Sequence, residues 1–365
     1  MKTVSFFKKY RKELLLASLF LLTFFFGLNE FWVERFYATG IYVLISNFFR
    51  ICFGWIPFSF GDLLYGLVLF IIIVNVRSLI RLWRLKLLSK NKWLQIARKF
   101  IRVVMVIYLV FQWFWGLNYH RLGSAYQLKI EPGKYTTTEL EQLADTLSSR
   151  LSQVIPQITP ADSAEWLDFK ALKSRCITDY KNTATSYAFV QYSHPSVKKM
   201  IIGSIGGYGG FSGYLNPFTG EAQLNENVPP FLRPFITCHE IGHQLGYAAE
   251  EEANMIGYLA ARQSSNPAVR YSVYHDMMTY ASRELYNVDS NAYHTYVAKL
   301  PSLAKRHSRQ ARDYYASFKN PVQNVVNQWY DLYLKANSQS KGVESYSYIT
   351  AWLIAYAKKY GWENI

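Results

Sequence analysis

The 365-residue sequence has only three cysteines, Cys52, Cys176 and Cys238, and they stand at no metal-binding spacing. This scarcity argues against a thiolate zinc site and against a cysteine nucleophile, because both need cysteines placed close to other ligands or to a base. Only Cys176 and Cys238 could pair within one soluble domain, and the sequence leaves that pairing open. Any chemistry must therefore come from other residue types.

Acidic residues are also few, since 25 Asp and Glu stand against 40 Lys and Arg, which gives a formal net charge of +15. Most of this excess lies in two basic segments, at residues 2–12 and 77–102, and the rest of the chain is nearly neutral. That distribution argues against a nucleic-acid-binding surface. Basic segments beside apolar runs instead mark the cytoplasmic side of a membrane.

Long apolar runs dominate the first third of the chain, and half of all residues are hydrophobic. They predict three transmembrane helices at about residues 13–30, 62–80 and 99–117. The segment at about 40–60 contains Arg50, Cys52 and Pro57, and we expect it to be amphipathic or re-entrant on the outer side. No small-x-small cleavage site follows the first run, which therefore predicts an uncleaved anchor and not a signal peptide.

The sequence thus predicts a membrane-anchored, mainly α-helical protein with two parts. Residues 1–117 form the membrane domain and residues 118–365 a helical domain with a small β-hairpin or sheet. A chain that starts inside and crosses three times has its N-terminus in the cytoplasm and its C-terminal domain outside it. We expect a multi-pass protein of the cytoplasmic (inner) membrane, with the lipid bilayer as a partner and no nucleic-acid partner.

The motif His239-Glu240-x-x-His243 carries the most specific chemical signal. Residues four apart share one face of a helix, so both imidazoles can reach one metal ion, and Zn²⁺ is the default for such a site. Glu240 would lie beside the water that the metal activates. A carboxylate there serves as general base and then as general acid in hydrolysis.

A third ligand is expected in the acidic run Glu250-Glu251-Glu252, because the final His of the metzincin pattern is replaced by Ala249. Gly246 is suited to end the first helix, and a second helix can start near Ala249. We assign Glu250 as the third ligand and Asn254, on the same helical face, as a group that orients a ligand. Glu251 is the alternative.

Two further features bear on the site. Residues 204–225 are rich in glycine and aromatics, and the turn signals Asn216-Pro217 and Thr219-Gly220 predict a hairpin beside the metal helix, whose edge strand could add a substrate backbone. The Lys-Ser/Thr of a phosphate-binding loop is missing there. A donor for the developing oxyanion is also needed. Its candidates on the next helix, among which the sequence does not choose, are His275, Tyr271, Tyr274 and Arg283.

The core HExxHQxGxAxExEAN resembles a multi-pass bacterial membrane family known as domain of unknown function 3810, related to the gluzincin metallopeptidases. The phrases FWVERFY, IPFSFGDLLYG, FWGLNYHR, GYLNPFTGEAQLN and GVESYSYI resemble the family's other signatures. The integral-membrane zinc proteases, including the CAAX prenyl protease, are a more distant likeness. Their E-x-x-A-D motif falls on Glu250 to Asn254, with Asn in place of Asp and a shorter gap after His243. The resemblance implies a zinc-peptidase-like site in a gluzincin (zincin-like) domain, and a periplasmic location.

Three functions are consistent with these features. The leading one is a membrane-anchored zinc metallopeptidase that acts outside the cytoplasm, with Glu240 as general base. The second is a non-catalytic, metal-binding membrane sensor or assembly protein. The third is a zinc hydrolase whose substrate is another cell-envelope component, such as a peptidoglycan stem peptide or a lipid-linked group.

Overall fold

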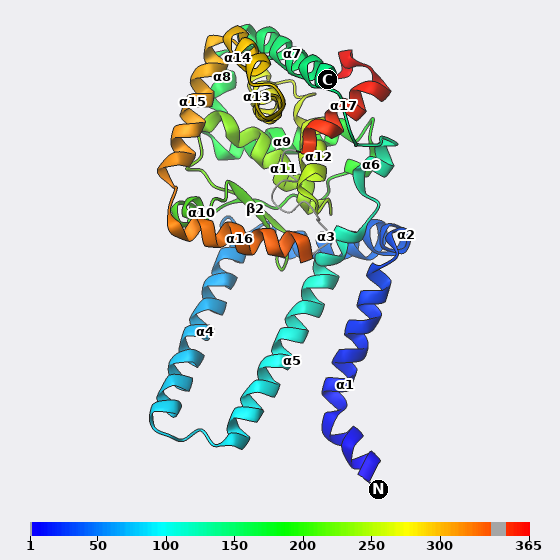
Figure 1. Ribbon diagram of the computed structural model, residues 1–365, viewed down its shortest axis with the longest axis vertical. Helices are drawn as coiled ribbons and strands as arrows, with labels where there is room; N and C mark the ends of the chain where they lie inside the picture. Colours follow the sequence, from blue (N-terminus) through cyan, green and yellow to red (C-terminus); the bar gives the residue numbers. More distant parts are fainter. Residues whose placement is uncertain (1, 337–347) are drawn as a thin grey trace.

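Three long helices, α1 (Lys2–Gly27), α4 (Phe60–Arg84) and α5 (Lys90–Phe114), extend from the same side of a helical domain (Figure 1). The computed structural model describes residues 2–336 and 348–365. At the base of the domain, α2 (Glu30–Trp32), a π-helical segment (Val33–Ile41) and α3 (Tyr42–Phe53) run across the tops of the long helices. The protein is mainly helical, as the sequence predicts.

The cap, length and apolar surface of helix α4 suit a helix that extends away from the domain. Ser59 caps its first turn by accepting a hydrogen bond from the Asp62 backbone N–H at 2.9 Å, and Arg81 and Arg84 occupy its last turn. Its 25 residues span about 37 Å, which exceeds the roughly 30 Å hydrocarbon core of a bilayer. None of its most apolar window is buried against protein. In water these side chains would have no apolar partner, so α4 suggests association with a membrane.

The prediction of three spans is wrong in number. Within the described residues, two helical stretches are long and apolar enough to cross a membrane, Glu30–Phe53 and Phe60–Arg84. The predicted spans 13–30 and 99–117 fall on α1 and α5, whose uncharged runs are short because charged residues lie inside the helices: Arg11, Lys12, Glu13, Arg98, Lys99 and Arg102. The first qualifying stretch includes much of the segment expected to be amphipathic or re-entrant, and it is partly buried against the domain.

The domain is formed by short and medium helices around one hydrophobic core. Helix α7 shows why they form: a capping box joins Thr136 and Glu139, and leucines at helical spacing are fully buried. The other helices are α6 (Gly123–Leu128), α8 (Pro160–Ala164), α9 (Phe169–Thr183), α10 (Gly203–Tyr208), α11 (Arg233–Gln244), α12 (Glu250–Ala261), α13 (Pro267–Val288), α14 (Ser290–Lys299), α15 (Ser302–Ser317), α16 (Pro321–Ala336) and α17 (Ile349–Tyr360), with α7 at Thr137–Val154.

The sheet has three short strands, β1 (Val197–Lys199), β2 (Gly213–Asn216) and β3 (Glu221–Leu224), in the order β1-β3-β2. Strands β2 and β3 form the predicted hairpin, with Gly213 opposite Leu224. Strand β1 pairs in parallel with β3 and was not anticipated. This arrangement leaves β2 at the edge of the sheet. The cysteines form no disulfide: Cys52, Cys176 and Cys238 are all free thiols.

A buried ion pair ties the base to the domain. The Arg121 guanidinium donates to both carboxylate oxygens of Glu34 at 2.8 and 2.9 Å, and to the carbonyl oxygen of Gly246 at 3.1 Å. The Arg121 side chain is 3% exposed. Its positive charge and hydrogen bond hold the pKa of Glu34 below the usual value, although burial alone would raise that pKa. The pair therefore fixes the turn between α11 and α12 relative to the base.

We expect Arg121→Ala to destabilise the protein by about 3–5 kcal/mol, because it leaves the Glu34 carboxylate buried without its partner. For a domain of this size that corresponds to a fall of roughly 10 °C in melting temperature. Thermal unfolding of the detergent-purified protein measures it. The matched control is Arg35→Ala, which removes an exposed arginine one residue from Glu34. Equal melting temperatures for the two variants would contradict a stabilising role for the pair.

Candidate metal centre

The sharp turn between α11 and α12 places the histidines opposite the acidic run. Gly246 has φ +88°, the left-handed conformation expected for a glycine just past a helix. Its N–H donates to the carbonyl oxygen of His243 at 2.8 Å. At Gly257 of α12, an added Cβ would lie 3.0 Å from the backbone nitrogen of His239, so the absence of a side chain lets the two helices approach closely. Helix α12 begins at Glu250, after Ala249 as its N-cap, as predicted.

The structure brings His239, His243 and Glu250 together. One potential ligand atom from each lies within 4.8 Å of the other two. Nε2 of His239 is 3.2 Å from Glu250 Oε2, and Nε2 of His243 is 3.6 Å from the same oxygen. All three residues are largely buried, because α11 and α12 pack against each other and against the sheet.

The other nitrogen of each imidazole is already engaged. Nδ1 of His243 lies 2.7 Å from the backbone carbonyl oxygen of Tyr247, which can only accept, so this nitrogen carries a proton. Nδ1 of His239 lies 2.8 Å from Oδ1 of Asn254, the residue that the sequence assigns to this orienting position. Both rings therefore turn Nε2 towards Glu250. Imidazoles that hold a metal through Nε2 commonly donate through Nδ1 in this way.

Without a metal, charge is balanced within the group. Burial lowers the pKa of His243, but the hydrogen bond and negative charge of Glu250 outweigh it and raise that pKa to about 9. Burial raises the pKa of Glu250, and the hydrogen bonds from the two imidazoles more than reverse this, so its pKa is well below the usual value. The Glu250 carboxylate thus faces a protonated imidazole. A cation bound between these residues would supply the positive charge that the proton supplies here.

Glu240 lies beside this group without joining it. Its carboxyl is buried, and its Oε2 has no hydrogen-bond partner within residues 2–336 and 348–365. Burial raises the pKa of Glu240 to about 7, while the charges of His239 and His243 act to lower it. Strand β2 passes close by, since a Cβ added at Gly213 would stand 2.6 Å from Oε1 of Glu240. The carboxylate is held between the histidines and the edge strand.

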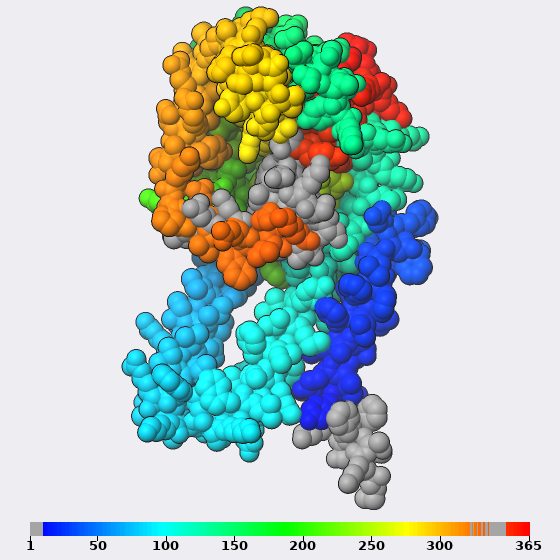
Figure 2. All heavy atoms as spheres, viewed as in Figure 1, coloured from blue at the N-terminus to red at the C-terminus, as the bar shows by residue number. Residues whose placement is uncertain are grey.

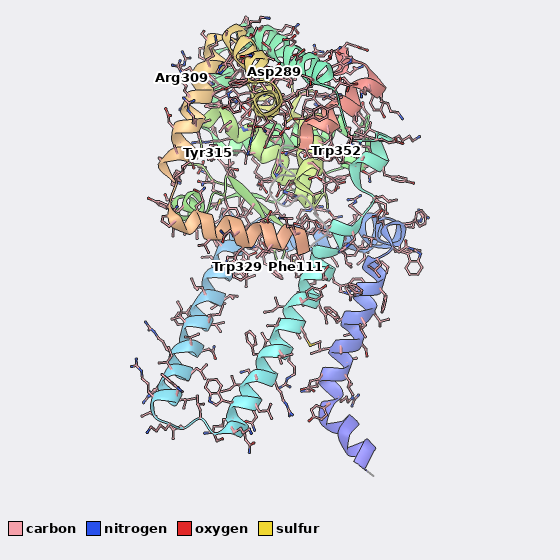
Figure 3. The ribbon with its side chains drawn as sticks, viewed as in Figure 1. Phe111, Asp289, Arg309, Tyr315, Trp329 and Trp352 are labelled. Atoms are coloured by element: carbon pink, nitrogen blue, oxygen red, sulfur yellow. The ribbon has the colours of Figure 1, made fainter. Side chains whose placement is uncertain are left out.

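A cavity of about 1330 Å³ opens in front of these residues. His239, His243, Glu250, Glu240 and Asn254 all line it. Glu251, the alternative third ligand, is half-buried and is not one of the lining residues of the described chain. Figure 3 marks two lining residues from other elements, Phe111 at the base on α5 and Tyr315 on α15 within the domain.

Sequence reasoning missed the polar residues that α13 contributes. Asp276 and Tyr280, four residues apart, line the cavity together with Tyr315, whereas the oxyanion candidates His275, Tyr271, Tyr274 and Arg283 do not. His275 is buried, and its ring packs on that of Phe231. The Tyr271 hydroxyl oxygen lies 2.7 Å from Nδ1 of His307. Burial raises the pKa of Asp276 to about 7, and the nearby charge of His239 acts to lower it. Asp276 and Tyr280 stand four residues apart and so share one face of a helix, and this spacing could have identified them from the sequence.

Residues 37–354 match the model of a family described as a protein of unknown function, DUF3810. The chain belongs to this family. The match covers most of the chain and includes His239, His243 and Glu250, the sheet and α4 of this DUF3810 protein. No curated protein and no solved structure matches the chain.

Proposed function

We propose that this DUF3810 protein is a membrane-anchored, zinc-dependent hydrolase, and specifically a metallopeptidase. The observation that carries the proposal is the orientation of the two imidazoles, each engaged at Nδ1 and each directing Nε2 at Glu250. Two nitrogens and one carboxylate oxygen form the ligand set of His₂Glu catalytic zinc sites, which keep a fourth position open. The adjacent cavity supplies room for that position.

His239, His243 and Glu250 would hold the ion, and Asn254 and the Tyr247 carbonyl would orient the two rings. When bound, zinc would polarise a substrate carbonyl and lower the pKa of water. Glu240 would take a proton from the attacking water as its oxygen adds to the amide carbon, and pass the proton to the nitrogen as the C–N bond breaks. The products are a carboxylic acid and an amine.

Two features support an enzyme over a metal-binding sensor or assembly protein. A buried carboxylate beside the metal ligands is unfavourable in a scaffold, because desolvation costs free energy without serving metal binding. The edge strand β2 also lines the cavity beside Glu240, where an extended substrate could pair with it. The ligand order, with Glu250 and Asn254 on the following helix, favours the gluzincin relationship. Peptide and cell-envelope substrates both fit this chemistry.

We further propose that α4 crosses the cytoplasmic membrane and that the domain lies outside the cytoplasm. The turn that joins α4 to α5 is at the far end from the domain and carries basic residues on both sides (Figure 1). Basic segments are retained in the cytoplasm. The metal site would then face the periplasm or the cell exterior.

We expect Asn254→Ala to weaken zinc binding by about 10–100-fold, because the His239 ring would lose the acceptor that fixes its tautomer and orientation. Competition with a chelator of known zinc affinity measures the change. Asn254→Asp keeps an acceptor oxygen in the same position and serves as the matched control, with affinity close to that of the wild type. An unchanged affinity in the alanine variant would show that Asn254 does not orient a ligand.

The proposed function is tested by EDTA-sensitive cleavage of a peptide library by the purified protein. Loss of that cleavage in a variant that still binds zinc separates hydrolysis from metal binding alone.

A further inference from the structure

We infer that the substrate is an acylated peptide, and that the cavity takes its fatty-acyl chain from the bilayer while the peptide lies at the metal site. This inference rests on the proposed hydrolase function and names its substrate class. It follows from where the cavity is polar, where it is apolar, and which surface its apolar end reaches.

The polar groups gather at one end of the cavity. Glu240, the three proposed ligands, Asp276 and Tyr280 come from α11, α12 and α13. The remaining polar carboxylate, Asp62, is engaged: it accepts a hydrogen bond from the Ile201 backbone N–H at 2.6 Å and another from the Tyr214 hydroxyl. The groups proposed for catalysis therefore cluster around the three potential ligands, and Asp62 is occupied by contacts of its own.

The other end of the cavity is apolar and is formed partly by the long helices. Leu63, Tyr65, Gly66 and Leu69 of α4 line it over two turns, and Phe111 lines it from α5. The same helix α4 buries none of its most apolar window against protein. The cavity wall and the surface that α4 offers to lipid are thus parts of one helix. Leu63, Leu69 and Phe111 give a hydrocarbon chain apolar surface along this wall, where the Asp62 carboxylate is already hydrogen-bonded to Tyr214 and Ile201.

The domain side of this end is apolar and exposed as well. Ile202, just before α10, and Ile205, within it, line the cavity and are 49% and 64% exposed. In water such a patch is unfavourable, and it marks a binding surface. Helix α16 lies at the base of the domain (Figure 2), and Asn320, the residue before it, donates from its side chain to the carbonyl oxygen of Tyr208 in α10 at 3.1 Å.

Helix α16 has the pattern of a helix that lies on a membrane surface. Val325, Trp329 and Leu332 are spaced to share one face and are all exposed. Trp329 lies at about the same height as Phe111, in the last turns of α5 (Figure 3). Tryptophan is enriched at membrane interfaces. Residues of α4 and Val326 of α16 both line the cavity, so an α16 that lies on the membrane surface places this end of the cavity where lipid head groups and acyl chains meet.

Size and strand geometry favour an acylated peptide over a free lipid. The cavity of about 1330 Å³ exceeds the roughly 300–1,000 Å³ of ordinary small-molecule sites, so it has room for a chain and a peptide together. Gly213, Tyr214 and Leu215 of the edge strand β2 line it beside Glu240. An extended peptide can form main-chain hydrogen bonds with such an edge strand, whereas a free lipid has no peptide backbone to pair with it.

The test uses one probe, an N-palmitoyl tripeptide with a diazirine at the far end of the acyl chain, added to the protein in phospholipid nanodiscs. Photolabelled residues are mapped by mass spectrometry with zinc and after EDTA. We expect labelling of the cavity wall at residues 200–211 as well as of the lipid-facing side of α4. An excess of unlabelled palmitoyl tripeptide should compete at least ten times better than palmitic acid.

Gly66→Phe is the decisive variant. A Cβ at Gly66 meets no atom within 4 Å, so the added ring can occupy the cavity without displacing the fold. We expect it to lower labelling of residues 200–211 at least fivefold. Leu67→Phe, at an exposed neighbour outside the cavity lining, is the matched control and should change nothing. Ile202→Asp, at an exposed lining position, offers a second route to the same loss if Gly66→Phe folds poorly.

The outcomes separate this inference from the proposed function. Labelling confined to the outer face of α4 in every variant, or equal competition by palmitic acid, would overturn the acylated-peptide inference even in a protein that binds zinc and cleaves peptides. Cavity labelling that persists after EDTA in a protein that shows no zinc and no hydrolysis would instead preserve the acyl-chain site and reject the hydrolase.

Discussion

Replacing Glu240 by Gln is expected to lower hydrolysis by about 10²–10⁴-fold, the usual contribution of a general base, while zinc stays bound. Gln has the shape of Glu but cannot accept the proton of the attacking water at neutral pH. Glu240 is not one of the three residues whose ligand atoms converge, so all three proposed ligands remain in this variant. The fold should also tolerate the change, because it removes a buried carboxylate whose Oε2 has no partner in the described chain.

The measurement is EDTA-sensitive cleavage of a quenched fluorescent peptide library, with zinc content determined on the same samples. Glu251→Gln is the matched control: it makes the same chemical change on α12, at a residue outside the cavity lining, and should cleave like the wild type. Cleavage at the wild-type rate by Glu240→Gln would eliminate the proposed mechanism. Reduced zinc in that variant would show that Glu240 belongs to the metal site itself.

The two helices that carry the candidate site, and the hairpin beside them, could be predicted because the sequence patterns that specify them are local. His239 and His243 stand four apart, Gly246 has the dihedral freedom that a helix end needs, and Glu250 follows at the start of the next helix. The hairpin of β2 and β3 was also predictable, since both its strands and its turn lie within one short segment. Each of these patterns depends on residues close in sequence, where helical spacing and turn chemistry apply directly.

The rest depends on contacts between distant segments, which no local pattern records. Strand β1 joins β3 across more than twenty residues of chain. Asp276 reaches the cavity only because α13 packs beside α11. The ion pair of Glu34 and Arg121 joins the segments FWVERFY and FWGLNYHR, and both support the turn between α11 and α12. The charged residues before the first and third apolar runs were expected to flank the spans, whereas helices α1 and α5 continue through them and so leave shorter uncharged runs.

Replacing Glu250 by Ala is expected to reduce bound zinc from near one ion per chain to a small fraction. Loss of an orienting residue weakens metal sites by about 10–100-fold, and loss of a ligand should exceed that. Two neutral imidazoles would then remain, without the carboxylate whose charge offsets that of the cation. Elemental mass spectrometry of the detergent-purified protein, prepared without chelators, gives the zinc content directly.

Glu251→Ala is the matched control, because it removes the alternative ligand from the same turn of α12. Comparing the two variants shows which glutamate is the third ligand. We expect it to retain zinc near the wild-type level, since the structure directs Glu250 and not Glu251 towards the histidines. The reverse pattern, with zinc lost from Glu251→Ala and kept by Glu250→Ala, would transfer the third-ligand role. A folded wild type that holds no zinc would remove the basis for hydrolysis and favour a sensor or assembly protein.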